Sequence, residues 1–187
     1  MSHAAAVGLF RSSPAGTATA TAADDESAAA LAEATVPQIE IQSSRFGKLT
    51  VDADRILRFP RGLLGFPNYE RYALIQAGDD NYFFWLQCVD EPNLAFVVTD
   101  PGIFFKSYEV PMKEETQQEL ELTDPAFAQT FVICNKVGEW LTGNLLGPIV
   151  VNAANRLAQQ VVLTEKKWTT RQPLMQLRAD QPLAKSA

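Results

Sequence analysis

The chain has 187 residues, the size of one domain, and its 16 Lys and Arg against 22 Asp and Glu give a formal net charge of −6 at pH 7. Hydrophobic residues make up 47% of the sequence, which excludes a wholly disordered chain because a sizeable core can be buried. The acidic balance argues against a protein that binds nucleic acid directly, since contacts with phosphates need a basic surface. No apolar run reaches the roughly 18 residues of a membrane span, so we expect no membrane contact.

The residue types that many enzymes use are scarce. His3 is the single histidine, and it lies in a segment that we expect to be disordered, so the folded part lacks the imidazole of a Ser-His-Asp or Cys-His device. Cys88 and Cys134 each lie within an apolar run, where a thiol usually packs as a small buried side chain. No secretory signal precedes them, so we expect reduced cysteines, a cytoplasmic protein, and neither a metal site nor a cofactor.

Residues 1–36 differ in composition from everything after them. Thirteen of the 36 are alanine, Ser and Thr fill many other positions, and the acidic run at 24–26 outweighs Arg11. Such a segment cannot bury enough apolar surface to offset its ordering entropy, so we predict a disordered acidic tail, either a tether for a partner or a passive extension. We also predict a frayed polar tail over residues 175–187.

From residue 37 the apolar side chains recur mostly at every second position, which is the period of a β-strand. Residues 38–42 and 48–52 alternate in this way on either side of a turn at 45–48 and predict a hairpin. Two Pro and two Gly at residues 59–67 predict an irregular loop. Further strands are predicted at residues 72–76, 82–89, 94–99, 130–135, 149–152 and 159–163.

Residues 111–122 break this pattern. They are rich in Glu and Gln, contain one β-branched residue, Thr116, and predict a short surface helix that ends before Asp124 and Pro125. Many short strands separated by Gly and Pro, with one small helix, favour a mainly β fold. We therefore predict a compact, barrel-like single domain over residues 37–174.

Carboxylate pairs are the remaining candidates for catalysis. Asp52 with Asp54, and Asp79 with Asp80, are close enough in sequence for general acid–base work, but both pairs lie in polar, turn-like stretches where carboxylates are normally solvated. The aromatic run at residues 82–85 lacks interleaved basic residues and is typical of a packed core. We therefore predict a binding protein with no catalytic residue. A β-barrel with a small-ligand site or a carboxylate-based active site stays open as the alternative.

Two apolar loops are candidates for contact with a partner. Residues 63–66 and 145–148 combine large apolar side chains with Gly or Pro, and loops normally lie at the surface. Pro148 has no backbone donor, so its segment cannot pair fully in a sheet. The alternative is that the leucines in these loops plug the ends of a barrel and are buried.

Blocks of sequence spread over residues 38–174 resemble, in the right order, the FliW family of flagellar assembly factors. The blocks are SRFG at 44–47 with FPRGLLGF at 59–66, then FWLQCVDEPNLAFVV at 84–98, NLLGPIVVN at 144–152 and TRQPL at 170–174. The resemblance implies a small β-barrel-like fold, no catalysis and a bacterial cytoplasmic location. It also implies two protein partners, which are flagellin and the RNA-binding translational regulator CsrA.

Members of the family antagonise CsrA, which relieves repression of flagellin translation. When free flagellin accumulates it occupies the family member, CsrA is released, and flagellin synthesis stops. Such an exchange requires that binding of one partner weakens binding of the other.

Our candidates for partner contact are Phe46, Phe66, Asp90, Glu91, Asn144, Leu145, Leu146 and Pro148. The apolar candidates are chosen because they lie in loops. The acidic turn is chosen because it favours the approach of a basic partner such as an RNA-binding regulator. Charge reversal at Asp90 or Glu91 is expected to slow association, and more so at low salt.

Overall fold

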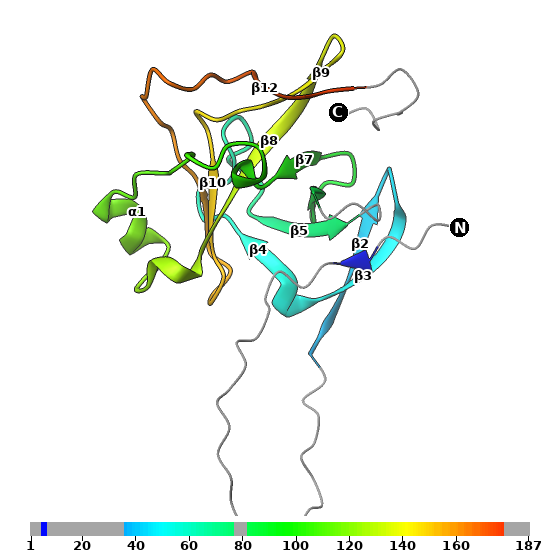
Figure 1. Ribbon diagram of the computed structural model, residues 1–187. Coiled ribbons are helices and arrows are strands. Elements are labelled where there is room, and N and C mark those ends of the chain that lie inside the picture. The colour runs from blue at the N-terminus through cyan, green and yellow to red at the C-terminus, as the bar shows by residue number, and fades with distance from the viewer. Residues whose placement is uncertain (1–4, 7–35, 77–81, 178–187) are drawn as a thin grey trace, which may run out of the picture.

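The computed structural model describes residues 5–6, 36–76 and 82–177 (Figure 1). This part of the chain contains one short α-helix, α1 (Glu114–Glu119), and the 3-10 turns η1 (Ala53–Arg55), η2 (Pro101–Ile103) and η3 (Pro125–Phe127). The strands are β1 (Ala5–Ala6), β2 (Gln38–Ser43), β3 (Gly47–Asp52), β4 (Ile56–Arg58), β5 (Arg71–Gln76), β6 (Phe83–Cys88), β7 (Ala95–Thr99), β8 (Ala128–Val137), β9 (Trp140–Gly143), β10 (Ile149–Asn152), β11 (Ala158–Gln160) and β12 (Gln172–Gln176). None of the helices in these ranges has the length and apolar character needed to cross a membrane.

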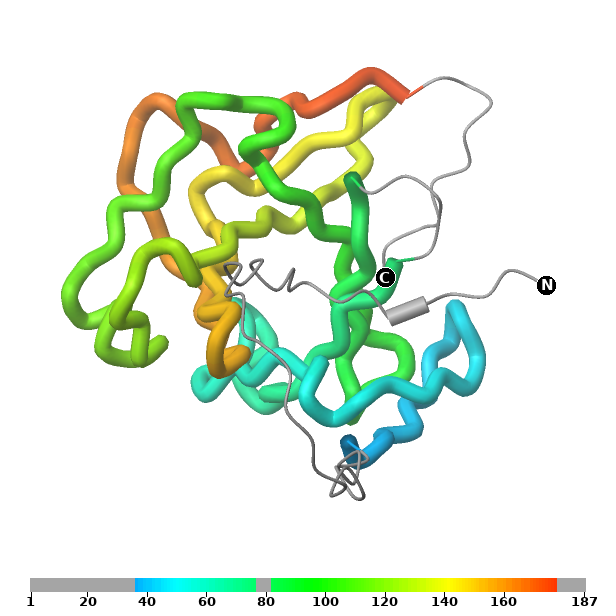
Figure 2. Tube along the Cα trace, turned by 60° about the horizontal axis from the view of Figure 1, so that its bottom comes forward, coloured from blue at the N-terminus to red at the C-terminus, as the bar shows by residue number. Residues whose placement is uncertain are grey.

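An antiparallel sheet curls through the order β4-β5-β6-β7-β8-β10-β11. The strand β8 also pairs with β9, and β9 pairs in turn with β12. The two outer strands of the row meet at a single parallel bridge between Arg58 and Leu157, where the Arg58 N–H donates to the Arg156 carbonyl at 2.9 Å. The sheet is therefore barrel-like without a closed ladder. The β2–β3 hairpin packs outside this sheet, and the segment that joins β7 to β8 lies on the side away from it (Figure 2).

Both faces of the central strands are buried, because the hairpin covers the outside of the curled sheet. Along β5, Tyr72 and Leu74 point into the barrel, whereas Ala73 and Ile75 pack beneath the hairpin. Buried side chains fill the barrel interior. They are Leu57, Phe59, Leu63, Tyr72, Leu74, Leu86, Cys88, Leu94, Val98, Phe131, Ile149, Val151 and Ala158. In the described part of the chain apolar side chains thus occupy the barrel interior, whereas a barrel that encloses a small ligand needs an open interior.

The predicted mainly β fold with one short helix is confirmed. The β2–β3 hairpin forms with Ile39 opposite Val51, and the strands predicted between residues 72 and 152 are present as β5, β6, β7, β8 and β10. The helix is shorter than predicted and forms around Glu114 and Glu115, whose charges favour the N-terminal turn of a helix. Its buried side is formed by Thr116, with Leu120 at its end.

Three strands of the domain that begins at residue 37 were not predicted, each for a local reason. β4 and β9 are short and have no clear alternation, and β12 contains Pro173 and an irregular register, which hide the strand pattern. The strand predicted at residues 159–163 is regular only as β11. Beyond it the chain still pairs, through the Val161 and Leu163 amides, with the carbonyls of the loop at residues 146–148.

The predicted tails differ from the structure at two places. Ala5 and Ala6 pair with the end of β5 as β1, although residues 1–36 were predicted to be disordered. At the other end β12 runs to Gln176, past the predicted start of fraying at residue 175. The other residues of the two tails, apart from Val36 and Leu177, lie outside the described residues.

Alkaline pH is expected to destabilise the domain through Cys134. Both cysteines are free and buried, and burial raises the pKa of Cys134 from an ordinary value of 9.0 to about 12. Between these values the unfolded chain has lost a proton that the folded protein keeps, so the free energy of unfolding falls with rising pH, by up to about 1.4 kcal/mol per unit. Urea unfolding at pH 8 and pH 10 measures this loss, which Cys134→Ala should reduce. An equal loss in the variant would rule out the thiol as its source.

Candidate protein-interaction site

The two apolar loops predicted from the sequence meet in the folded protein. Gln160 of β11 lies between them: its Oε1 accepts from the Leu64 N–H at 3.0 Å, and its Nε2 donates to the Gly147 carbonyl at 3.1 Å. One side chain thus holds together two sequence blocks that are about 80 residues apart. The sequence could not reveal this, because Gln160 lies outside both blocks.

The loop at residues 59–67 buries one leucine and exposes the next. Gly62 and Gly65 both adopt positive φ, and the Phe66 N–H donates to the Leu63 carbonyl at 2.8 Å to close a tight turn. Leu63 then packs in the barrel core, whereas Leu64 is 58% exposed. Phe66, one of the predicted contact residues, is half-buried.

The loop at residues 144–148 is mostly buried, which corrects part of the prediction. Leu145 is fully buried against Trp168, and Pro148 is also buried, so neither is presented to a partner. Tyr108 closes over the loop and donates its hydroxyl to the Leu145 carbonyl at 2.8 Å. Leu145 is buried, as the alternative expected, but it packs with Val132 and Trp168 in a cluster separate from the barrel interior and does not plug the barrel. Leu146 is half-buried.

A shallow groove of about 610 Å³ lies where the two loops face the end of β8. We call it the mouth groove. It is lined by Leu63, Leu64, Phe96, Ile133, Asn135, Lys136, Val137, Asn144, Gln160, Thr170 and Arg171. Phe66 packs edge-on against Phe96 with 5.3 Å between ring centroids, so two of the predicted residues, Phe66 and Asn144, belong to this groove or support it.

The predicted acidic turn is held in place by Gln87, which is fully buried. The Gln87 amide donates to the carbonyls of Cys88 and Leu94 at 3.0 and 3.1 Å, and its oxygen accepts from Ser43 at 2.8 Å. In the turn itself Asp90 forms an ion pair with Arg71, and the Glu91 carboxylate caps the turn by accepting from Asn93. Asp90 therefore has a cationic partner within the protein, which weakens the charge that it offers to another molecule, whereas Glu91 accepts hydrogen bonds from neutral amides and keeps its charge.

Replacing Gln87 with leucine is expected to cost about 2 kcal/mol of unfolding free energy, because the buried Ser43 hydroxyl and the turn carbonyls lose their partner. Ser43→Ala, which removes one of these hydrogen bonds, is expected to cost about 1 kcal/mol. Urea unfolding compares the two variants. If Gln87→Leu is as stable as the wild type, the amide does not hold the turn.

Phe46 lies in the turn between β2 and β3. Its ring packs edge-on against Trp85 at 5.8 Å between centroids, and the guanidinium of Arg45 lies 4.6 Å from the centre of the same indole. Phe46 is half-buried in this cluster. Its first role is therefore to fix the hairpin on the sheet.

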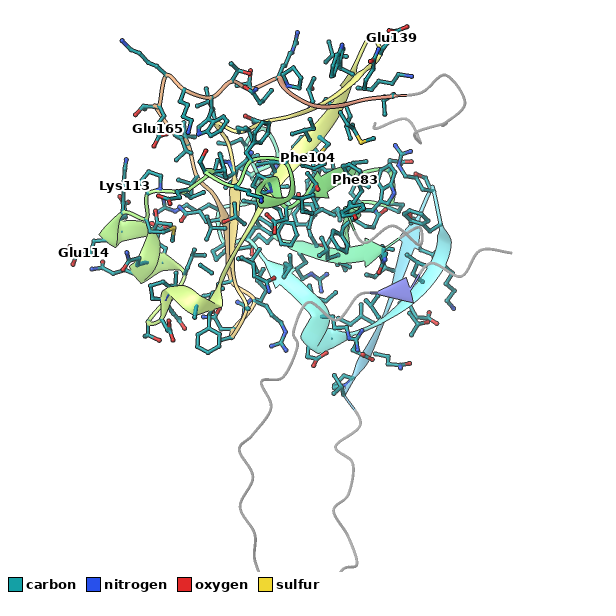
Figure 3. The ribbon with its side chains drawn as sticks, in the orientation of Figure 1. Phe83, Phe104, Lys113, Glu114, Glu139 and Glu165 are labelled. Atoms are coloured by element: carbon teal, nitrogen blue, oxygen red, sulfur yellow. The ribbon has the colours of Figure 1, made fainter. Side chains whose placement is uncertain are left out.

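An acidic surface that the sequence did not single out lies at residues 109–124, which we call the acidic arm. It carries six carboxylates, of Glu109, Glu114, Glu115, Glu119, Glu121 and Asp124, against Lys113. All of these except Glu119 are exposed, and Figure 3 shows Lys113 and Glu114 directed away from the body. The many Glu residues of the predicted helix indicated an acidic surface. They did not indicate a binding site, because a charged helix surface is usually only exposed to water.

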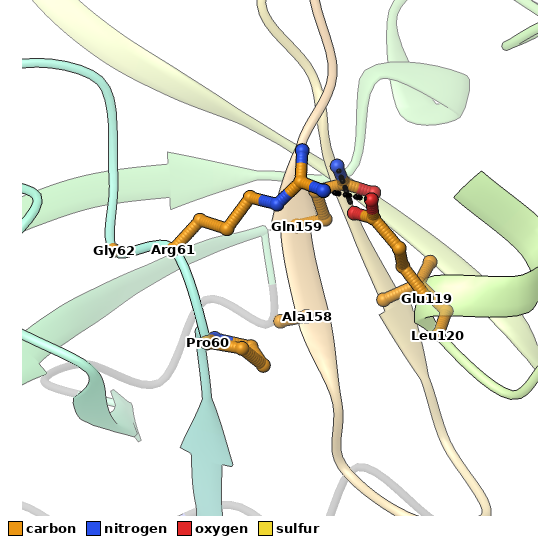
Figure 4. Close-up of a pocket in the computed structure, with 7 residues that line it drawn as sticks. All are labelled: Pro60, Arg61, Gly62, Glu119, Leu120, Ala158 and Gln159. Atoms are coloured by element: carbon orange, nitrogen blue, oxygen red, sulfur yellow. Dashed lines mark hydrogen bonds and ion pairs between the residues drawn. The ribbon is translucent and has the colours of Figure 1, made fainter. Parts of the chain in front are cut away.

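The acidic arm is anchored to the barrel by polar contacts. Glu119 forms an ion pair with Arg61 and accepts from Gln159 at 2.8 Å, so that all three side chains converge (Figure 4). Asn152 donates to the Leu120 carbonyl at 2.9 Å. Beneath the ion pair lies a cavity of about 150 Å³ lined by residues 60–62, 119–120 and 158–159. These contacts tie the arm to the same loop that forms the mouth groove.

Two of the carboxylates that were weighed as catalytic groups form ion pairs with different arginines. Asp52 pairs with Arg55 at 3.0 Å and Asp54 with Arg156 at 3.7 Å, whereas Asp79 and Asp80 lie outside the described residues. Within the described ranges no three His, Cys, Asp or Glu side chains come together in a metal-binding cluster. The features that stand out at the surface are therefore the mouth groove and the acidic arm.

Comparison with known proteins identifies the family. The family model described as "FliW protein" matches residues 40–174, which is most of the chain and includes both loops, the mouth groove and the acidic arm. The chain belongs to the FliW family. It is 39% identical over 140 residues to the flagellar assembly factor FliW of Magnetococcus marinus, which covers 73% of this chain and 85% of that protein.

Other FliW proteins agree with this assignment. The flagellar assembly factor FliW of Bacillus subtilis is 34% identical over 136 residues, covering 72% of this chain and 95% of the relative. A crystal structure of the flagellar assembly factor FliW superimposes with a TM-score of 0.67 at 32% identity and covers 73% of this chain and 96% of the other. The FliW domain is thus shared in sequence and in fold, and the first 39 residues of this chain precede the matched region.

Proposed function

We propose that this chain is a non-enzymatic, cytoplasmic flagellar assembly factor that binds CsrA and flagellin in exchange. Binding of CsrA antagonises its repression of flagellin mRNA, and binding of flagellin releases CsrA. Membership of the FliW family supports this proposal, since its relatives are named flagellar assembly factors. The observation that carries it is a solid barrel with two surfaces of unlike chemistry, the acidic arm and the mouth groove.

The acidic arm suits CsrA. An RNA-binding protein presents a basic surface to phosphates, and the arm offers six carboxylates against one lysine within 16 residues. Opposite charges raise the rate of encounter more than they tighten the final complex. The arm gathers five exposed carboxylates, whereas in the Asp90–Glu91 turn the Asp90 carboxylate is ion-paired with Arg71.

Calorimetry with the cognate CsrA and flagellin tests the proposal. We expect each to bind the purified chain, and flagellin added to the preformed CsrA complex to release CsrA. If neither protein binds, the proposal is wrong. If both bind at once with unchanged affinities, the exchange is wrong although the partners are correct.

Charge reversal in the acidic arm is expected to slow the association with CsrA. Glu115 is exposed in the first turn of α1, and Glu115→Lys should lower the association rate about fivefold at low salt, with a smaller effect at high salt. Glu70→Lys, at an exposed position outside the arm, makes the same change in net charge and serves as the control. Stopped-flow kinetics at two ionic strengths compare them. Equal slowing by both variants would mean that net charge matters and the arm does not.

A further inference from the structure

We propose that the mouth groove binds a segment of a polypeptide partner in which carboxylates stand next to apolar side chains, and that this segment belongs to flagellin. The assignment to flagellin rests on the proposed function. Two features of the groove support it: the apolar side chains in its lining, and two cations that form no ion pair within the described residues.

Five of the eleven residues that line the groove have apolar side chains. Phe96 and Ile133 are half-buried at its base, where they also pack against the barrel core. Leu64 is 58% exposed and Val137 is 41% exposed, and both line the groove. Exposed apolar side chains gathered in one concave surface are typical of a protein-binding site, where a partner removes them from water.

The charged side chains that line the groove are both cationic. They are Lys136 and Arg171, and the lining contains no carboxylate. Neither forms an ion pair with a residue in the described part of the chain, whereas Lys48, Arg55, Arg61, Arg71 and Arg156 all do. An occupant with carboxylates placed over these two cations is therefore favoured, and a basic occupant is repelled.

The opposite charges of the two surfaces indicate which partner binds at each of them. The acidic arm attracts a basic protein, and the cations of the mouth groove repel one, so CsrA is the partner expected at the arm. This leaves the mouth groove for flagellin. The two sites are distinct, but they are joined by residues 60–64, since Arg61 pairs with the arm and Leu64 lines the groove.

Charge reversal at the rim tests this proposal with purified cognate flagellin and CsrA. Lys136→Glu and Arg171→Glu are each expected to weaken flagellin binding at least tenfold and to leave the affinity for CsrA within about twofold. Leu64→Asp, which changes an exposed apolar side chain, should act in the same direction. Lys166→Glu is the matched control, because Lys166 is exposed and does not line the groove. Circular dichroism and urea unfolding verify that each variant is folded.

The outcomes separate the proposal from the function on which it rests. If wild-type protein fails to bind flagellin, both the proposed function and this assignment are wrong. If it binds flagellin and the rim variants bind as well as Lys166→Glu does, only the groove assignment is wrong. If the rim variants lose CsrA and keep flagellin, the occupant is the other partner. Overlapping flagellin peptides should compete only when Asp or Glu stands beside apolar residues, and competition by basic peptides would contradict the proposal.

Discussion

Replacing Gly62 with alanine is expected to lower the free energy of unfolding by about 4 kcal/mol, a loss that belongs among the largest for single substitutions. Gly62 has a φ of +63°, which disfavours any L-residue with a side chain. An added Cβ would also lie 2.4 Å from the Phe66 carbonyl oxygen and 2.7 Å from the Pro67 Cα. These are backbone atoms, so the turn itself must shift. Urea unfolding measures the loss.

Gly65→Ala provides the matched control in the same loop. Gly65 also has positive φ, at +87°, but an added Cβ meets no atom within 4 Å. Gly65→Ala is therefore expected to lower the free energy of unfolding by about 1 kcal/mol, which is the cost of holding alanine in the left-handed conformation. Similar losses in both variants would show that conformation alone, and not the close approach of Phe66, demands glycine at position 62.

The second large loss of stability is expected on replacing Leu145. Both leucines lie in loops, so sequence alone suggests similar small losses for Leu145 and Leu64, whereas the structure predicts a large loss at Leu145 only. Leu145 is fully buried with Val132 and Trp168, so Leu145→Ala is expected to cost about 3 kcal/mol of unfolding free energy. Leu64→Ala, at a side chain that is 58% exposed, is expected to change stability by less than about 0.5 kcal/mol.

Binding measurements complete this comparison. Leu64→Ala should weaken flagellin binding without loss of stability, whereas Leu145→Ala, studied well below its unfolding midpoint, should bind flagellin normally. A stable Leu145→Ala protein would contradict the packing described for the loop at residues 144–148.

The hairpin, the central strands and the helix could be predicted because their patterns are local. Ile39 and Ile41 alternate with polar residues, and the mainly β fold follows from several such segments. β12 could not be predicted, since Pro173 interrupts its ladder and its partner β9 lies about 30 residues earlier. Its pairing depends on contacts that no short window of sequence contains.

The candidate site was predicted in outline and corrected in detail. The first apolar loop lines the groove through Leu63 and Leu64, whereas the second reaches it only through the preceding residue, Asn144. The sequence also cannot tell which leucine of these loops faces solvent. Leu64 is exposed because Gly62 and Gly65 turn the chain, and Leu145 is buried because Tyr108 and Trp168, distant in sequence, cover it. The sequence shows that residues 109–124 are acidic. It does not show that this arm is fixed to the barrel, which depends on the contacts of Glu119 with Arg61 and Gln159.

The seam between β4 and β11 has a consequence for how the domain moves. A continuous ladder spreads the free-energy cost of separating two strands over several hydrogen bonds, but here the row closes at one isolated bridge, where the Arg58 N–H donates to the Arg156 carbonyl. The barrel therefore has a weak line along which it opens locally before it unfolds globally, and the Arg58 amide exchanges its hydrogen faster than the amides in the middle of β6. Because the loop that begins at Phe59 follows directly from β4, each such opening also loosens the base of the turn that presents Leu64.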